Sequence, residues 1–217
     1  MITGCLRRFL LLQVVALMVT NVAFAACPCR AEKKVLDDSK TGNATWILDY
    51  VYPVADFPTA GIQFHWYNSL LREPAAFGRA IRELAKRYRG SHIEAIAGID
   101  STGFIFGAAL AYELRVPFIL VRKSGKFPEN IEKISYQLEP GGTTFEIEKD
   151  SILEGQKVLV IDDVLVTGRT PAAACTLLEA LGAEVLEVAC LIELAALKGR
   201  ERIAHPVFSL IAIEELK

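Results

Sequence analysis

The stretch Val158-Leu-Val-Ile-Asp-Asp-Val-Leu-Val-Thr-Gly-Arg-Thr170 decides how the chain folds. Its first four residues are all apolar, which is typical of a strand that is buried on both faces of a sheet. Two acidic residues, Asp162 and Asp163, follow at the predicted carboxyl end of this strand, and the segment from Thr167 to Thr170 then opens a helix. The pattern predicts polar groups at the edge of an open α/β sheet, where such sheets bind ligands.

The same stretch carries the groups needed to hold a sugar phosphate. Backbone N–H groups at the start of a helix, together with the hydroxyls of Thr167 and Thr170, would form a cradle for a phosphate dianion. Two adjacent carboxylates would repel the phosphate itself. They would, however, accept hydrogen bonds from sugar hydroxyls and lie near a divalent cation. The implied ligand is a ribose 5-phosphate unit.

Strand-like and helix-like segments alternate around this unit. The apolar patterns predict strands at 93–97, 117–121, 158–161, 185–192 and 207–213, and helices at 77–88, at 104–114 and between Thr170 and Gly182. Residues 124–150 hold three glycines between short β-like runs, which indicates a flexible β-hairpin flap. The order predicts an α/β fold with a mostly parallel central sheet and helices on both faces.

Composition limits the class of protein. The chain has 217 residues, of which 52% are hydrophobic and 23% charged, so one folded domain with appendages is expected rather than disorder. Its net charge of −2 argues against broad nucleic-acid binding, which requires a basic surface. Of the five cysteines, Cys175 and Cys190 lie inside apolar segments and are predicted to be buried thiols, not parts of a disulfide scaffold.

The first 26 residues form a segment like a signal peptide. They contain no acidic residue, and Arg7 and Arg8 precede an apolar run that ends before Ala23-Phe-Ala25. The run is shorter than the ~20 residues of a spanning helix, so export to the periplasm or beyond, with no stable membrane span after cleavage, is expected. The alternatives are an uncleaved anchor, a lipoprotein, or a mis-assigned start that leaves the protein cytoplasmic. Residues 27–50 are predicted to be a tail or a short leading helix.

The stretch 158–170 resembles the signature of the type I phosphoribosyltransferases, which use 5-phosphoribosyl 1-diphosphate (PRPP). Further segments resemble the adenine phosphoribosyltransferases within that family: 55–61, 96–104, 121–126, 135–139 and 197–201. The resemblance implies the type I phosphoribosyltransferase fold over residues 51–217, including the flap (hood). It also implies the conversion of adenine and PRPP to AMP and diphosphate in purine salvage, with Mg²⁺, by a homodimer.

The resemblance also implies a role for each matching residue. The ribose 5-phosphate would be bound by Asp162, Asp163, Val166, Thr167, Gly168, Arg169 and Thr170, and the diphosphate by Asp100, Ser101, Lys123 and Lys126. Adenine would contact Gln63, Phe64 and Leu165, and the flap residue Glu139 would manage the proton on the purine as the catalytic acid or base. Mg²⁺ would be held mainly by PRPP, with Asp162 or Asp163 reaching it through water.

Several positions depart from the family pattern. His65 and Trp66 stand where relatives carry Arg-Asp, Thr102 replaces an arginine, Arg169 replaces a glycine, and Pro140 replaces an aromatic residue. Losing a guanidinium near the diphosphate costs about 1.5–3 kcal/mol of binding. Weakened PRPP binding is therefore expected. The alternative function is a catalytically weak or inactive exported protein that binds purines or nucleotides; a purine-responsive repressor is disfavoured because residues 27–50 are short and not basic.

Overall fold

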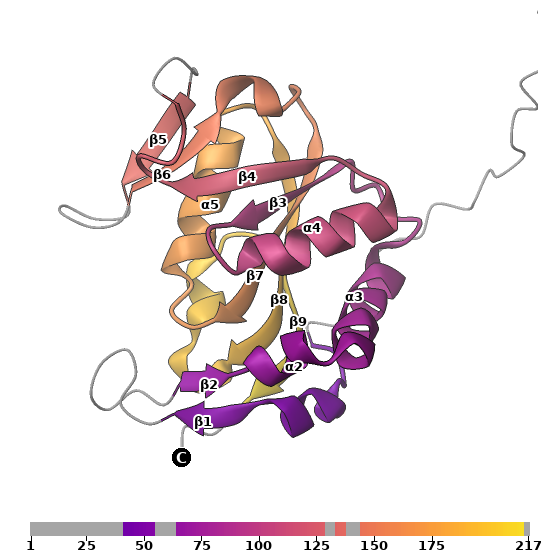
Figure 1. Cartoon of the computed structure of the whole chain (residues 1–217). Helices are drawn as coiled ribbons and strands as arrows, with labels where there is room; N and C mark the ends of the chain where they lie inside the picture. Colours follow the sequence, from indigo (N-terminus) through magenta and orange to yellow (C-terminus); the bar gives the residue numbers. More distant parts are fainter. Residues whose placement is uncertain (1–40, 55–63, 129–132, 138–143, 215–217) are drawn as a thin grey trace, which may run out of the picture. The chain divides into compact units, whose positions relative to one another are not determined.

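The computed structural model describes residues 41–54, 64–128, 133–137 and 144–214. Seven of the described strands form one sheet in the order β5-β6-β4-β3-β7-β8-β9 (Figure 1). The five strands from β4 to β9 in this order run parallel, and β6 joins β4 antiparallel. Their bounds are β3 (Ala95–Ile99), β4 (Phe118–Lys123), β5 (Lys133–Gln137), β6 (Thr144–Glu148), β7 (Lys157–Leu165), β8 (Glu184–Leu194) and β9 (Val207–Ile213). The predicted mostly parallel sheet is confirmed.

Helices cover both faces of this sheet. The helices α3 (Pro74–Tyr88) and α4 (Gly103–Leu114) pack on one face, and α5 (Arg169–Glu179) packs on the other (Figure 1). Alternate residues of β7 explain this arrangement, because Leu159 and Ile161 belong to the first core while Val158 and Val160 belong to the second. A continuous apolar run therefore supplies two hydrophobic cores at once.

Local signals set the ends of α3. Pro74 occupies its first turn, and the Glu73 side chain accepts a hydrogen bond from the Ala75 N–H at 3.4 Å. The buried ion pair from Arg87 to Glu187 of β8, with N–O distances of 2.7 and 3.0 Å, fixes the other end of the helix. Tyr88 also donates to Glu187 at 2.8 Å, so the buried carboxylate is satisfied.

The hairpin predicted within residues 124–150 is formed by β5 and β6, which pair antiparallel. A second, two-stranded sheet of β1 (Tyr52–Val54) and β2 (Phe64–Trp66) was not predicted. The sequence predicts a loop there, because Pro53, Pro58 and Gly61 are typical of turns and loops. A two-stranded ribbon tolerates proline at an edge, and this explains the difference.

Five short elements complete the described part of the chain. They are the helix α2 (Asn68–Arg72) and the 3-10 helices η1 (Thr45–Tyr50), η2 (Lys149–Ser151), η3 (Ala195–Leu197) and η4 (Gly199–Arg202). Within the described ranges, no helix has both the length and the apolar character needed to cross a bilayer. The signal-like segment 1–26 and most of the predicted tail, 27–40, lie outside these ranges.

Candidate active site

The two acidic residues lie inside β7 rather than after it. The sequence predicted that the strand ends at Ile161, but β7 continues to Leu165 because the long strand β8 goes on pairing with it, up to Leu165 and Glu193. On the other side, the pairing with β3 stops at Gly98 and Ile161. Asp162 is therefore the first β7 residue beyond the pairing with β3, and the acids lie at the carboxyl end of that shorter strand.

Gly103, at the start of α4, allows the 100–103 loop to lie close to these acids. A Cβ on Gly103 would lie 2.8 Å from the Ile161 carbonyl oxygen and 3.3 Å from Asp162 Oδ1. Only glycine allows this approach, since real Cβ contacts are longer. The 100–103 loop thus meets the Asp162 carboxylate directly, and the predicted diphosphate loop and ribose site are adjacent.

The loop from Val166 to Thr170 has the geometry of an anion cradle. Gly168 has φ +73°, a left-handed conformation, and α5 begins at the next residue, Arg169. The first N–H groups of α5 have no partner within the helix and are directed out of its N-terminus. The predicted 5-phosphate residues are therefore gathered at one helix start.

A second glycine, Gly199, packs against the backbone of the 166–168 loop. A Cβ on Gly168 would lie 2.0 Å from the Gly199 carbonyl oxygen, and a Cβ on Gly199 would lie 2.4 Å from the Val166 carbonyl oxygen. The neighbouring Arg200 pairs with Glu193 of β8, and its Nη1 donates to the Val207 carbonyl at 2.5 Å. These partly buried contacts hold η4 against the phosphate loop. In the sequence analysis, the segment 197–201 stood only as part of the resemblance to the family.

The predicted diphosphate residues surround the end of β4. The Asp100–Ser101 peptide bond is cis, and the Asp100 carboxylate accepts the Lys123 N–H at 3.3 Å. Buried Glu146 of β6 accepts the Ser124 hydroxyl at 2.7 Å and the Gly125 N–H at 3.3 Å. The loop that carries Lys123 and Lys126, both exposed, is thereby held by the hairpin.

Burial disfavours the charged form of the acids. Burial, the adjacent Asp163 charge and a side-chain hydrogen bond with Asp163 raise the pKa of Asp162 well above its ordinary value, whereas the Asp163 backbone N–H and Lys123 act in the opposite direction. A cation or a set of hydroxyl donors would relieve this cost. The described part of the chain gathers no cluster of three or more His, Cys, Asp or Glu side chains. Two adjacent carboxylates fit a hydrated Mg²⁺ that is bound chiefly by substrate phosphates.

One residue that the sequence did not assign, Tyr67, completes the site. The hydroxyl of buried Tyr67 donates to Asp163 Oδ2, and the Thr102 side chain lies beside the same hydroxyl. Burial and the Asp163 charge raise the pKa of Tyr67 far above its ordinary value, so it remains a phenol. A tyrosine after an apolar strand is typical of a core residue, and no sequence signal marked its hydroxyl.

The predicted adenine contacts are only partly described. Leu165 is buried at the end of β7 with 3% of its surface exposed, and Phe64 begins β2. Gln63, the catalytic candidate Glu139 and the substituted Pro140 lie outside the described residues. The contacts of Gln63, Phe64, Leu165 and Glu139 with adenine therefore stay predictions.

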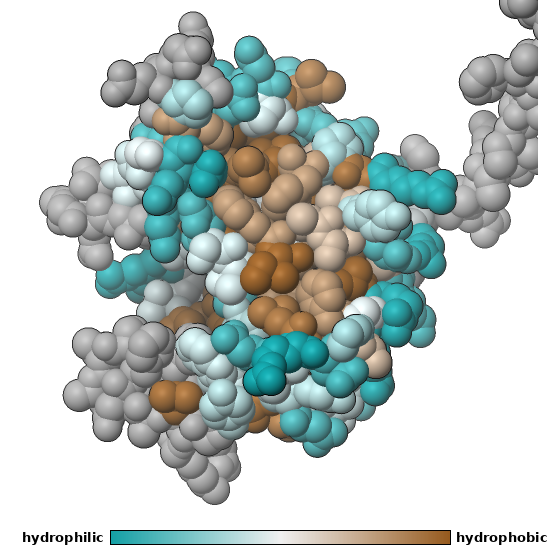
Figure 2. Space-filling model, viewed as in Figure 1, coloured by the Kyte–Doolittle hydropathy of each residue, from teal (hydrophilic) through white to brown (hydrophobic). Residues whose placement is uncertain are grey.

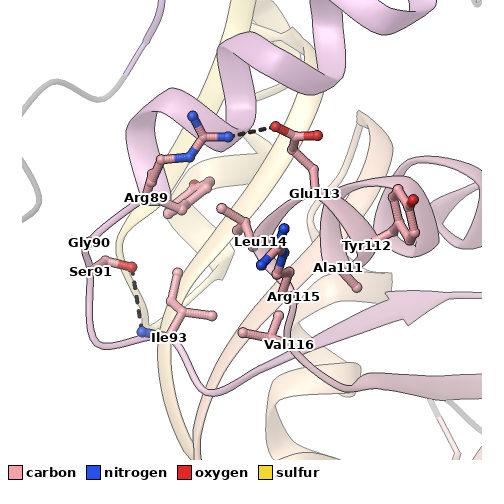
Figure 3. A pocket seen from close by; sticks show the side chains of 11 residues that line it. Arg89, Gly90, Ser91, Ile93, Ala111, Tyr112, Glu113, Leu114, Arg115 and Val116 are labelled. Carbon is pink, nitrogen blue, oxygen red and sulfur yellow. Dashed lines mark hydrogen bonds and ion pairs between the residues drawn. The ribbon is translucent and has the colours of Figure 1, made fainter. Parts of the chain in front are cut away.

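A cavity of about 810 Å³ lies away from these residues, between the C-terminal ends of α3 and α4 (Figure 3). The Arg89–Glu113 ion pair, at 2.5 Å, joins the two helix ends beside it, and Ile93 and Val116 contribute apolar lining. None of its lining residues comes from the stretch 158–170. This cavity is separate from the predicted sugar-phosphate site.

Comparison with known proteins identifies the family. Residues 67–216 match the phosphoribosyl transferase domain. The adenine phosphoribosyltransferase of Roseiflexus sp. (strain RS-1) is 50% identical over 168 residues, which cover 77% of this chain and 98% of that protein. The chain belongs to the adenine phosphoribosyltransferase family. The human adenine phosphoribosyltransferase is 48% identical over 163 residues, covering 73% of this chain and 91% of the human protein.

Solved structures of the family share the fold. The adenine phosphoribosyltransferase of Thermoanaerobacter pseudethanolicus ATCC 33223 is 40% identical, with a TM-score of 0.73 over 77% of this chain and 98% of that one. The Giardia lamblia enzyme, solved with 9-deazaadenine, is 35% identical, with a TM-score of 0.71 over 78% of this chain and 97% of that one. Both the resemblance read from the sequence and the predicted fold class are confirmed.

Proposed function

We propose that the chain transfers the 5-phosphoribosyl group of PRPP to N9 of adenine, which forms AMP and releases diphosphate. The observation that carries the proposal is the adjacency of the Asp162–Asp163 pair, the left-handed Gly168 and the N-terminus of α5. Together they offer acceptors for two vicinal hydroxyls and donors for a phosphate. Identity of 48–50% to the Roseiflexus and human adenine phosphoribosyltransferases favours this activity over the alternative of a weak purine-binding protein.

Acidic residues are proposed to bind the sugar hydroxyls, and N–H donors and lysines to bind the phosphates. Asp162 and Asp163 accept hydrogen bonds from the ribose hydroxyls, and residues 166–170 wrap the 5-phosphate with backbone N–H groups and threonine hydroxyls. Lys123, Lys126 and the loop at Asp100–Ser101 face the diphosphate, where negative charge grows as the bond to C1 breaks. Mg²⁺, when bound with PRPP and reached by Asp162 or Asp163 through water, would supply further neutralisation of that charge.

The purine is proposed to lie between Gln63, Phe64 and Leu165, with Glu139 of the flap exchanging the proton of the ring. Displacement at C1 joins N9 to the sugar, and the bond to diphosphate breaks with its electron pair. The N9 proton leaves as the new bond forms. A closed hairpin would exclude water, which would otherwise hydrolyse PRPP.

The chain is also proposed to act as a homodimer, paired through α4 and β4. The outer side of α4 carries Ile105, Ala108 and Tyr112, and Leu120 of β4 is 37% exposed. Figure 2 shows an apolar area over these elements, with a hydrophilic margin. Exposed apolar faces of this kind are typical of protein interfaces. Ile105→Lys should shift the protein toward monomer in sedimentation, whereas Leu153→Lys, at an equally apolar exposed site in the turn before β7, should not.

The site of action is proposed to be the cytoplasm, although the segment 1–26 predicts export. PRPP is expected in the cytoplasm, and Cys175 and Cys190 are free buried thiols. N-terminal sequencing of the protein from fractionated native cells tests both predictions. An uncleaved start in the soluble fraction supports the cytoplasm, and a start after Ala25 or Ala26 supports export.

Incubation with labelled adenine, PRPP and Mg²⁺ tests the activity directly. Labelled AMP should appear only when all three are present, and guanine or hypoxanthine should be poor replacements for adenine. No AMP at saturating PRPP would reject the proposal.

A further inference from the structure

Tyr67 is held firmly where its hydroxyl meets the ribose-binding acids. It lies between β2 and α2 with 4% of its surface exposed, and its ring packs on Phe106 of α4 with centroids 5.9 Å apart. Phe77 of α3 packs on the same Phe106 ring at 5.7 Å. Because the ring is enclosed on these sides, the position of the hydroxyl is set by the core and does not depend on a ligand.

The hydroxyl lies at the junction of the two parts of the proposed PRPP site. It donates to Asp163 Oδ2, and the Thr102 side chain, at the start of α4, lies beside it. Thr102 directly follows Asp100–Ser101, the proposed diphosphate loop. The Tyr67 hydroxyl is therefore placed between that loop and the acid proposed to bind the ribose.

The Asp163 carboxylate needs such a partner. Its own N–H donates to Asp162 Oδ1 at 3.0 Å, so the two like-charged groups lie close together. Repulsion would rotate a free Asp163 side chain away from Asp162. The bond from Tyr67 occupies Oδ2 and leaves Oδ1 for a ligand, so it selects one rotamer of the carboxylate.

We propose that Tyr67 is a positioning residue, whose hydroxyl holds the Asp163 carboxylate toward the ribose hydroxyls of PRPP. This inference rests on the proposed function.

Tyr67→Phe removes only the hydroxyl and keeps the ring contacts. The KM for PRPP should rise about tenfold, the value for one lost charge-assisted hydrogen bond, while the KM for adenine stays unchanged. Binding of ribose 5-phosphate, measured by calorimetry, should weaken by the same factor. This second measurement does not depend on turnover.

Tyr88→Phe is the matched control. Tyr88 is also buried and also donates to a carboxylate, that of Glu187, but it lies toward the amino ends of the strands, where Glu187 pairs with Leu159. This variant should lower thermal stability and leave the KM for PRPP unchanged. If Tyr67→Phe and Tyr88→Phe give the same KM for PRPP, the positioning role is overturned.

Thr102→Val tests whether the Thr102 side chain acts on the Tyr67 hydroxyl beside it. Alone it should raise the KM for PRPP by about two- to fivefold, and it should have no further effect in the Tyr67→Phe protein, because coupled residues are non-additive. Additive effects would overturn the link between Thr102 and Tyr67. A wild-type protein that binds ribose 5-phosphate but makes no AMP would reject the proposed function, while the binding comparison would still decide the role of Tyr67.

Discussion

Gly168 and Gly199 pack backbone against backbone, so the phosphate loop rests directly on η4. A Cβ on either residue would lie within 2.4 Å of a carbonyl oxygen of the facing segment. Neither neighbour is the flexible end of a side chain, so neither can move aside cheaply. The shape of the 5-phosphate cradle depends on two glycines from distant parts of the chain.

Gly199→Ala should impair the cradle without a cost from backbone strain, because Gly199 does not have a positive φ. Displacing the 166–168 loop should raise the KM for PRPP at least tenfold and destabilise the protein by about 1–3 kcal/mol. Steady-state kinetics and urea unfolding measure the two effects. Gly78→Ala, in α3 beside the flexible Arg82 side chain, is the control and should be neutral or slightly stabilising. Equal behaviour of the two variants would show that the close approach is unimportant.

Asp163→Asn should preserve the fold, since an amide oxygen can still accept the hydrogen bond from Tyr67. PRPP affinity should fall at least tenfold, because an amide neither attracts hydrated Mg²⁺ nor accepts from a ribose diol as strongly as a carboxylate. Titration calorimetry with PRPP and Mg²⁺ measures this. Asp150→Asn in η2, on the exposed surface, provides the control. Unchanged affinity in Asp163→Asn would remove this residue from the ribose site.

Thr102→Arg should restore a positive charge beside the diphosphate. The inhibition constant for diphosphate should fall about tenfold, the lower value expected for one charge-assisted contact. The affinity for PRPP should gain less, because arginine no longer places the Thr102 hydroxyl beside Tyr67. Thr102→Gln, the control, adds length without charge and should not lower the inhibition constant. An unchanged inhibition constant in Thr102→Arg would mean that no diphosphate group lies near position 102.

The buried thiols should make the protein less stable in alkali. Burial, with a contribution from Glu179, raises the pKa of Cys175 to about 12, so the folded thiol stays neutral while the unfolded thiol ionises at its ordinary value. Between these pH values the unfolded state binds fewer protons, and the free energy of unfolding falls by up to about 1.4 kcal/mol per pH unit per thiol.

Urea midpoints between pH 8 and pH 10.5 measure this fall. Cys175→Ala should flatten the decline relative to the wild-type protein, and Cys190→Ala should do the same, since burial raises the pKa of that thiol as well. Identical slopes in all three proteins would contradict the expectation.

The elements that were predictable share strong local signals. Pro74 marks the start of α3, and the apolar run before Asp162 marks β7, because period and capping depend only on neighbours in sequence. The end of β7 was predicted too early. Its last residues pair only with β8, and the length of a partner strand cannot be read from the strand itself.

Sequence reasoning named candidate site residues where a residue type is tied to chemistry. The Asp162–Asp163 pair and Gly168 were named because paired acids after a buried strand and a glycine before a helix match a known ligand-binding pattern. Tyr67 was missed because a tyrosine is common in cores, and its proposed role depends on Asp163, which is far away in sequence. The contact of Gly199 with the phosphate loop was missed for the same reason, since close packing of two distant backbone segments produces no periodic pattern in the sequence.

The carboxylate of Glu146 ties the loop after β4 to the flap hairpin through Ser124 and Gly125. The base of the hairpin and the lysine-bearing loop consequently shift as one piece, and the hairpin cannot swing on its β4 side without carrying Lys123 and Lys126 along. In the proposed reaction, one acidic side chain would therefore couple the diphosphate-facing lysines to the hairpin that covers the purine.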